Sequence, residues 1–103
     1  MEGRFYATFL GPAMEFIGGL SGEDQLKFTN AVAAMKQGDF LAVRTKVLKG
    51  SIRELIIKNY RLIYFLKPPT LYFLRGFVKK TNKTPKKEIE LAEKMYNLIN
   101  NQN

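Results

Sequence analysis

The sequence predicts an α+β domain with the element order β-α-α-β-β-β-α. Three observations support this order: an alternating segment near the N-terminus, three apolar runs in the second half of the chain, and helical periodicity in the remaining segments. The three later strands are joined by short connections, which force antiparallel neighbours. We therefore expect a small, largely antiparallel sheet, with two N-terminal helices on one face and a third helix at the C-terminus.

The N-terminal half is predicted to form one strand followed by two helices. Residues 4–10 alternate between apolar and polar side chains, and a Gly-Pro pair ends the strand. The proline suits the first turn of a short helix over residues 12–20. Ser21 is the expected N-cap of a second helix over residues 22–37, and Gly38 is its expected stop.

The C-terminal half is predicted to form three strands and a final helix. Residues 43–50 are interpreted as an irregular basic connector. Strands follow at residues 52–57, 60–66 and 71–78, separated by turn residues. Thr84 is the expected N-cap of the last helix, because the proline after it occupies a position that favours a helix start.

The composition indicates a single folded domain over residues 1–103. A hydrophobic content of 46% argues against disorder, and no apolar run approaches the length of a membrane span. The chain has no cysteine and no histidine, which excludes disulfides and a Ser-His-Asp site, and its nine acids show no metal-ligand spacing. Its start resembles neither a signal peptide nor a transit peptide. We expect a cytoplasmic protein without a metal, another cofactor or a membrane partner.

Positive charge is concentrated in the second part of the chain. Residues 1–43 hold three basic and five acidic side chains, a net charge of −2. Residues 44–103 hold fourteen basic and four acidic side chains, a net charge of +10, and the whole chain carries +8. The alternative is a charge that serves only solubility, but solubility does not require clustered cations. The distribution favours binding of nucleic acid or the ribosome.

The most informative segment is residues 76–88, GFVKKTNKTPKKE, between a predicted strand and a predicted helix. Lysines held at one corner of a domain can bind phosphates and release condensed counterions. A rigid support lowers the entropy loss that a flexible tail would suffer on binding. We therefore predict an RNA-facing edge. Its lysines are Lys79, Lys80, Lys83, Lys86 and Lys87.

Two arginines are predicted on the sheet beside this edge. Arg61 lies on the central strand, and Arg75 shares a parity with Leu71 and Phe73 on the last strand. If the register allows, Arg61 and Arg75 meet on one face, which we expect to be concave and basic. An arginine on an apolar strand needs an anion, which is either a phosphate or Glu54 in a structural salt bridge.

Scission of RNA needs a base for the 2′-OH, stabilisation of charge on the phosphorane, and an acid for the leaving oxygen. In a crowded cationic site, neighbouring positive charges disfavour protonation of a lysine, so Lys79 or Lys80 is the best candidate for the base. Glu54 is the alternative base, and Tyr60 or Tyr96 can serve as a weak proton donor. Such a site needs its substrate positioned by another body.

Three segments resemble a known family. Residues 47–55 (VLKGSIREL), 60–65 (YRLIYF) and 76–85 (GFVKKTNKTP) resemble the RelE/HigB toxins of bacterial type II toxin–antitoxin systems, with most similarity to the phage-associated HigB-like branch. The resemblance covers most of the chain and implies a RelE-like fold. It also implies a ribosome-dependent endoribonuclease that cleaves messenger RNA. Such toxins are held in a complex by a small antitoxin, here expected to be of the helix-turn-helix type.

The resemblance implies roles for individual residues. Arg61 matches the central-strand arginine that contacts the scissile phosphate, and Lys79 and Lys80 match the basic pair that closes the last strand. Lys49 lies in the connector that faces RNA in relatives. The predicted catalytic residues are Arg61, Lys79, Lys80, Arg75 and Glu54, and the predicted RNA-binding residues are Lys46, Lys49, Lys58, Lys83, Lys86 and Lys87.

The chain departs from that branch at two positions. Ile56 stands where the branch often has an arginine, and Arg75 stands where it often has a histidine. Arginine can hold a phosphate but is a poor proton shuttle. Two alternatives therefore remain: an inhibitor of DNA gyrase similar to ParE, which shares this fold without the nuclease set, and a catalytically weakened relative that only binds RNA or antitoxin.

Overall fold

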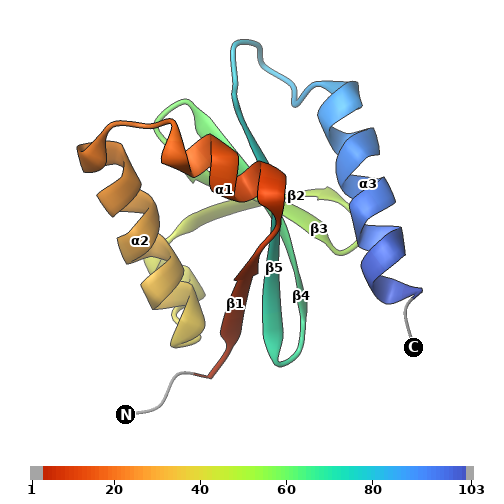
Figure 1. Ribbon diagram of the computed structural model, residues 1–103, viewed down its shortest axis with the longest axis horizontal. Helices are drawn as coiled ribbons and strands as arrows, with labels where there is room; N and C mark the ends of the chain where they lie inside the picture. The colour runs from red at the N-terminus through yellow and green to blue at the C-terminus, as the bar shows by residue number, and fades with distance from the viewer. Residues whose placement is uncertain (1–3, 102–103) are drawn as a thin grey trace.

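The computed structural model, which describes residues 4–101, contains one five-stranded sheet within that range (Figure 1). In chain order the elements are β1 (Tyr6–Phe9), α1 (Gly11–Gly18), α2 (Gly22–Lys36), the short 3₁₀ helix η1 (Phe40–Ala42), β2 (Arg44–Lys49), β3 (Ile52–Ile57), β4 (Tyr60–Lys67), β5 (Thr70–Val78) and α3 (Lys86–Asn100). The strand order is β1-β5-β4-β3-β2, in which only β1 and β5 are parallel neighbours. The predicted α+β class and the largely antiparallel sheet are confirmed.

The sheet separates two hydrophobic cores. On one face, which we call the α1–α2 face, Phe28 and Met35 of α2 pack with Leu62 of β4, as predicted for the first two helices. On the opposite face, the α3 face, Ala92 packs with Phe65 of β4. Figure 1 shows α2 and α3 on opposite sides of the sheet. The face expected to be open is therefore partly covered by α3, which leaves only part of it for a ligand.

The structure corrects the prediction for residues 43–50. Most of this segment forms β2, which pairs antiparallel with β3 as an edge strand, rather than an irregular connector. The register shifts between Val47 and Lys49, so the alternation of the strand is interrupted. Basic side chains are typical of exposed edge strands, and here they obscure the apolar half of the pattern.

A register shift in β5 corrects the predicted parity. Arg75 pairs with Ile63, but Phe73 pairs with the next residue of β4, which leaves Leu74 without a partner of its own. Leu71 and Phe73 accordingly belong to the core of the α1–α2 face, while Leu74 belongs to the core of the α3 face. The prediction that Arg75 shares a face with Leu71 and Phe73 is wrong, because an extra residue reverses the alternation.

The helix ends confirm one predicted cap and correct another. The Ser21 Oγ accepts a hydrogen bond from the backbone N of Asp24 (3.2 Å), and Gly38 follows the helix with a φ of +82°. Thr84 does not cap α3, because Pro85 occupies the N-cap position and no side chain caps that helix. The Thr84 hydroxyl is directed to the sheet instead.

Candidate nucleic-acid interface

The sheet register places two cations of β2, Arg44 and the predicted Lys46, in the same rows as Arg61 and Glu54. Arg44 is opposite Ile56, which is opposite Arg61, and Lys46 is opposite Glu54 in the next row. Side chains directly opposite one another in a sheet project from the same face. Arg44 and Lys46 therefore extend the α3 face beyond Arg61. Arg44 is absent from the predicted set, because its segment was interpreted as a connector.

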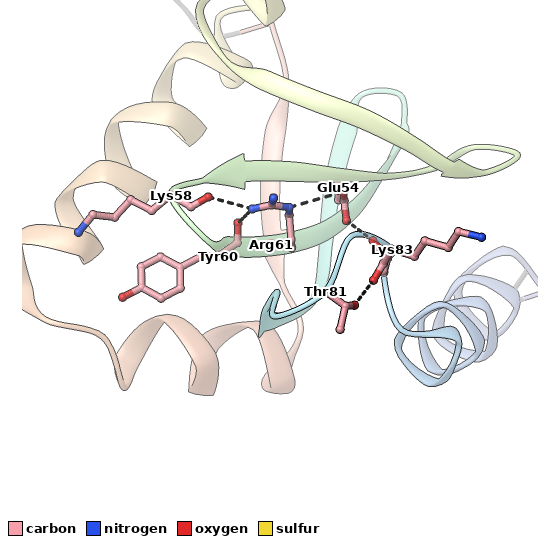
Figure 2. Close-up of polar contacts among 7 residues, drawn as sticks. Glu54, Lys58, Tyr60, Arg61, Thr81 and Lys83 are labelled. Carbon is pink, nitrogen blue, oxygen red and sulfur yellow. Dashed lines mark hydrogen bonds and ion pairs between the residues drawn. The ribbon is translucent and has the colours of Figure 1, made fainter.

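Arg61 is a largely buried side chain with 14% exposure, held from two sides. Its Nη1 donates to the carbonyl oxygens of Lys58 (3.0 Å) and Tyr60 (2.8 Å), and its Nε lies 3.6 Å from the Oε2 of Glu54. Figure 2 shows the guanidinium between Glu54 and the hairpin turn that joins β3 to β4, residues 58–59. The structural ion pair considered as an alternative is thus present. Within residues 4–101, no hydrogen bond engages Nη2, so this nitrogen retains its donors for an anion.

Glu54 is a completely buried carboxylate with one satisfied oxygen. Its Oε1 accepts a hydrogen bond of 2.8 Å from the Thr84 Oγ1. Across residues 4–101, neither its Oε2 nor the Nε of Arg61 has a hydrogen-bond partner. Buried polar atoms without partners are uncommon and destabilising. The Glu54–Arg61 pair is therefore incompletely hydrogen-bonded. Thr84, which the sequence pattern predicts as a helix cap, is the hydrogen-bond partner of this pair instead.

Arg75 lies on the α3 face with Arg61, as expected. Its Nε is 2.7 Å from the Oε1 of Glu88, and both side chains are mostly buried. This ion pair joins β5 to the first turn of α3. The guanidinium of Arg75 is thus engaged by a protein carboxylate, although not by the one that the sequence suggested.

The segment between β5 and α3, residues 79–85, is called the lysine loop and lies at the top of Figure 1. The backbone N of Lys79 donates to the carbonyl oxygen of Asn59 (2.7 Å), so the strand pairing continues beside the hairpin turn that Arg61 holds. In the part of the chain that the structure describes, no carboxylate pairs with the lysines predicted for this edge. These lysines are Lys79, Lys80, Lys83, Lys86 and Lys87, and their charge is available to a polyanion.

Two other predicted RNA-binding lysines are not brought into this group. The Lys49 Nζ lies 2.8 Å from the Oε2 of Glu93 on α3. The Lys58 Nζ lies 2.8 Å from Asp24 of α2, whose other carboxylate oxygen accepts from the Tyr60 hydroxyl at 2.8 Å. The hydrogen bond from Lys58, followed by that from Tyr60, lowers the pKa of Asp24, and Asp24 raises the pKa of Lys58 and Tyr60. This cluster lies on the α1–α2 face.

Two grooves flank α2. The larger, about 590 Å³, lies between α1 and α2 and has a mostly apolar lining that includes Met14 and Val32. The smaller, about 410 Å³, lies between α2 and the β2–β3 strands and includes Ala31 and Leu55. Neither includes Arg61 or the lysine loop, so neither is the concave basic site that the sequence predicts. Over residues 4–101, no cluster of acidic side chains could hold a metal ion, and no helix is long and apolar enough to cross a membrane.

A family model described as Phage derived protein Gp49-like (DUF891) matches residues 15–97, and the chain belongs to this family. Its fold is similar to that of a chain in the archaeal RelE-RelB complex from Pyrococcus horikoshii OT3, with a TM-score of 0.66, 11% identity, and coverage of 74% of this chain and 96% of the other. It is also similar to a chain of the RelB-RelE antitoxin-toxin complex from Methanococcus jannaschii (TM-score 0.60, 15% identity, coverage 80% and 93%). The isolated E. coli RelE toxin gives a TM-score of 0.53 at 13% identity, with coverage of 88% and 98%.

No curated protein has a sequence that matches the chain significantly. The structural similarities nevertheless establish the RelE fold, and with the family match they confirm the predicted relationship to RelE-type toxins.

Proposed function

We propose that the protein is the toxin of a type II toxin–antitoxin system and acts as a ribosome-dependent endoribonuclease that cleaves messenger RNA and inhibits translation. The observation that supports this most strongly is the position of the lysine loop, which starts beside the turn that Arg61 holds. The lysine loop, whose lysines have no carboxylate partner within residues 4–101, therefore starts beside a turn that Arg61 holds, on the partly open face of a RelE fold. Within the same residues, the Nη2 of Arg61 makes no hydrogen bond. This combination suits a bent RNA backbone.

In this proposal Arg61 stabilises negative charge on the phosphorane through Nη2. Because two carbonyl oxygens and Glu54 already fix its guanidinium, little reorganisation is needed in the transition state. Lys79 or Lys80, in its neutral form, takes the proton of the 2′-OH as this oxygen attacks the phosphorus. The ammonium group of the other lysine protonates the 5′-oxygen as its bond to phosphorus breaks, and the remaining lysines of the edge hold the neighbouring phosphates. Arg75 supports this arrangement through its ion pair with Glu88 at the start of α3. The ribosome supplies the bent and positioned substrate.

Mapping of RNA ends in cells that express the protein tests this function. We expect cuts in translated messenger RNA with a fixed position relative to the codon, and no such cuts for an inactive Arg61→Ala variant. Breaks in chromosomal DNA without RNA cuts would identify an inhibitor of gyrase. If neither RNA cuts nor DNA breaks appear, the protein is the catalytically weakened relative. The ion pair of Arg75 with Glu88 favours this alternative.

The partner in this proposal is an acidic antitoxin, with an amphipathic segment that docks in the groove between α1 and α2. The groove is apolar, Met14 in its wall is 62% exposed, and Lys36 in its lining can pair with a carboxylate of the partner. The net charge of +8 steers an acidic partner towards the chain. The groove lies on the face opposite the lysine loop, so docking there leaves the basic edge uncovered.

Isothermal titration with the product of the neighbouring short open reading frame tests the partner. Met14→Glu places a charge in the apolar groove and is expected to weaken binding by about tenfold or more. Leu41→Glu is the matched control, because Leu41 is fully exposed and lies outside the groove. Absence of binding at micromolar concentration would contradict the partner, and equal effects of the two variants would contradict the docking surface.

A further inference from the structure

We infer that Thr84, Glu54 and Arg61 form a positioning chain that couples the lysine loop to Arg61, with Glu54 as a positioning residue and not a base. This inference rests on the proposed function. It adds how the lysine loop and Arg61, the two parts of the proposed site, are held in position relative to each other. The three residues come from three segments: the lysine loop, β3 and β4. Figure 2 shows Glu54 between Arg61 and the lysine loop.

The first support is the direction of the Thr84 hydroxyl. A threonine before a helix ordinarily turns its oxygen to the backbone N–H groups of the first turn. Here α3 has no side-chain cap, and the Thr84 Oγ1 instead donates to the Oε1 of Glu54 at 2.8 Å, across 30 positions of sequence. A local bond is thus replaced by a tertiary bond that ties the end of the lysine loop to the middle of the sheet.

The second support is the burial of Glu54. Its exposure is 0%, so its carboxylate does not meet solvent and cannot reach a 2′-OH on RNA in this conformation. Removal of the Thr84 hydroxyl would leave both of its oxygens without a hydrogen bond, because Oε2 already lacks one. Leaving buried acceptors unpaired is strongly unfavourable. Glu54 therefore holds the loop in place and simultaneously faces Arg61.

The third support is the separation of 3.6 Å between the Oε2 of Glu54 and the Nε of Arg61. Both atoms are buried and lack a hydrogen-bond partner within residues 4–101. A shift of roughly 0.7 Å would convert this ion pair into a charge-assisted hydrogen bond. In the positioning chain, an anion that draws the lysine loop towards itself also moves Glu54 relative to Arg61 and so changes this separation. Phosphate contacts at the loop are in this way transmitted to the guanidinium.

The test compares Thr84→Val, which removes only the hydroxyl, with Thr84→Ser, which keeps it. Thr29→Val is the matched control, because the Thr29 hydroxyl bonds only its own helix at the carbonyl oxygen of Gln25. The first readout is the NMR signal of the Arg61 Nε–H, assigned by its loss in Arg61→Lys. We expect this signal to shift in Thr84→Val and to stay near its wild-type position in Thr84→Ser and Thr29→Val.

The second readout is cleavage of ribosome-bound messenger RNA. We expect kcat to fall by about tenfold or more in Thr84→Val, with KM changed by less than about twofold, because the residue positions reacting groups and does not bind RNA itself. A role of Thr84 that is confined to anchoring α3 would leave the Arg61 signal unchanged, and that result would overturn the inference.

The two readouts separate this inference from the proposed function. A shifted Arg61 signal, in a protein whose wild type cuts no ribosome-bound RNA, would support the coupling and contradict the nuclease. Ribosome-dependent cleavage that is equally fast in Thr84→Val would support the nuclease and overturn the coupling. If Thr84→Val does not fold, Thr84→Ala gives the same comparison, because it also removes the hydroxyl and leaves Glu54 and Arg61 unchanged.

Discussion

Two buried carboxylates lie on opposite faces of the β3–β4 hairpin and differ in how completely they are satisfied. Asp24, on the α1–α2 face, pairs one oxygen with Lys58 and the other with Tyr60, each at 2.8 Å. Glu54, on the α3 face, accepts a hydrogen bond from the described part of the chain on one oxygen only, and the Nε of Arg61 lies 3.6 Å from the other. A fully hydrogen-bonded network makes a region rigid, whereas a partly satisfied one is less stable. On the α3 face, the Nη2 of Arg61 has no hydrogen bond within residues 4–101 and can bind an anion.

The turn between β3 and β4 is held from both faces of the sheet. Asp24 holds the side chain of Lys58 from one face, while Arg61 donates to the carbonyl oxygen of Lys58 from the other. Lys58 has a φ of +55°, in the left-handed region that a lysine rarely adopts, so the turn benefits from both contacts. The Asp24 cluster and Arg61 therefore both stabilise the turn, so Arg61 has a structural role in addition to its proposed catalytic one.

The largest expected effect is that of Arg61→Ala, which removes the ion-pair partner of Glu54. Cleavage should fall by about 10²-fold or more, because a contact to transition-state charge is lost. The free energy of unfolding should fall by about 3–5 kcal/mol, because a buried carboxylate loses its counter-ion. Urea denaturation and a cleavage assay measure the two effects.

The double variant Arg61→Ala with Glu54→Gln separates these effects. It should regain part of the lost stability, because the uncompensated charge is gone, while cleavage stays absent. If Arg61→Ala alone is as stable as the wild type, Arg61 does not compensate Glu54, and the contrast with Asp24 disappears.

The next largest effect is expected for Lys80→Ala, which removes one positive charge from the lysine loop. Because Lys80 is exposed and makes no ion pair within residues 4–101, the free energy of unfolding should change by less than about 0.5 kcal/mol. Cleavage should nevertheless fall by about 10²-fold if Lys80 contacts the reacting phosphate. Asp24→Asn is the matched comparison, with lower stability and unchanged cleavage. Full toxicity of a soluble Lys80→Ala protein would remove Lys80 from the site.

The smallest effect is the pH dependence of the Asp24 cluster. Since the pKa of Asp24 is lowered from 3.8 by Lys58 and Tyr60, its stabilising contribution is present above that value and is lost as the pH falls through the lower folded pKa. Since Asp24 raises the pKa of Lys58 from 10.5, the Lys58 contribution is full below that value and is lost as the pH rises through the higher folded pKa. Tyr60, raised from 10.0 chiefly by the same carboxylate, follows the same sign.

Urea denaturation of the wild type and Asp24→Asn across the pH range measures this dependence. The stability advantage of the wild type should be constant between about pH 5 and pH 9 and should shrink on both sides. An advantage that persists unchanged at pH 2 would mean that the Asp24 carboxylate is not the source of the stability.

The sequence predicts most of the fold because its strong patterns are local. The strand at residues 52–57 has the predicted bounds, and the Ser21 cap is present. The edge strand β2 is missed because its alternation is interrupted by a register shift. The parity of Arg75 is missed because an unpaired Leu74 reverses the alternation, and no local rule reveals an extra residue of this kind.

The candidate site is predictable in its residue types and less so in their partners. Arg61 and Glu54 lie on neighbouring antiparallel strands, so their ion pair could be named as an alternative from the sequence. Thr84 follows a local capping rule that a tertiary contact overrides, and Lys58 turns to Asp24 because α2 packs on the opposite face. Contacts between distant segments decide these partners, and a pattern of neighbouring residues does not contain them.

A cleavage assay with the purified protein tests most directly whether the α3 face of the β3–β4 hairpin is a nuclease site. The assay compares free and ribosome-bound copies of the same messenger RNA. We expect efficient cutting on the ribosome, poor cutting of the free RNA, and loss of both in the Lys80→Ala protein. Efficient cutting of free RNA that ribosomes do not change, or no cutting on the ribosome at all, would contradict a ribosome-dependent nuclease.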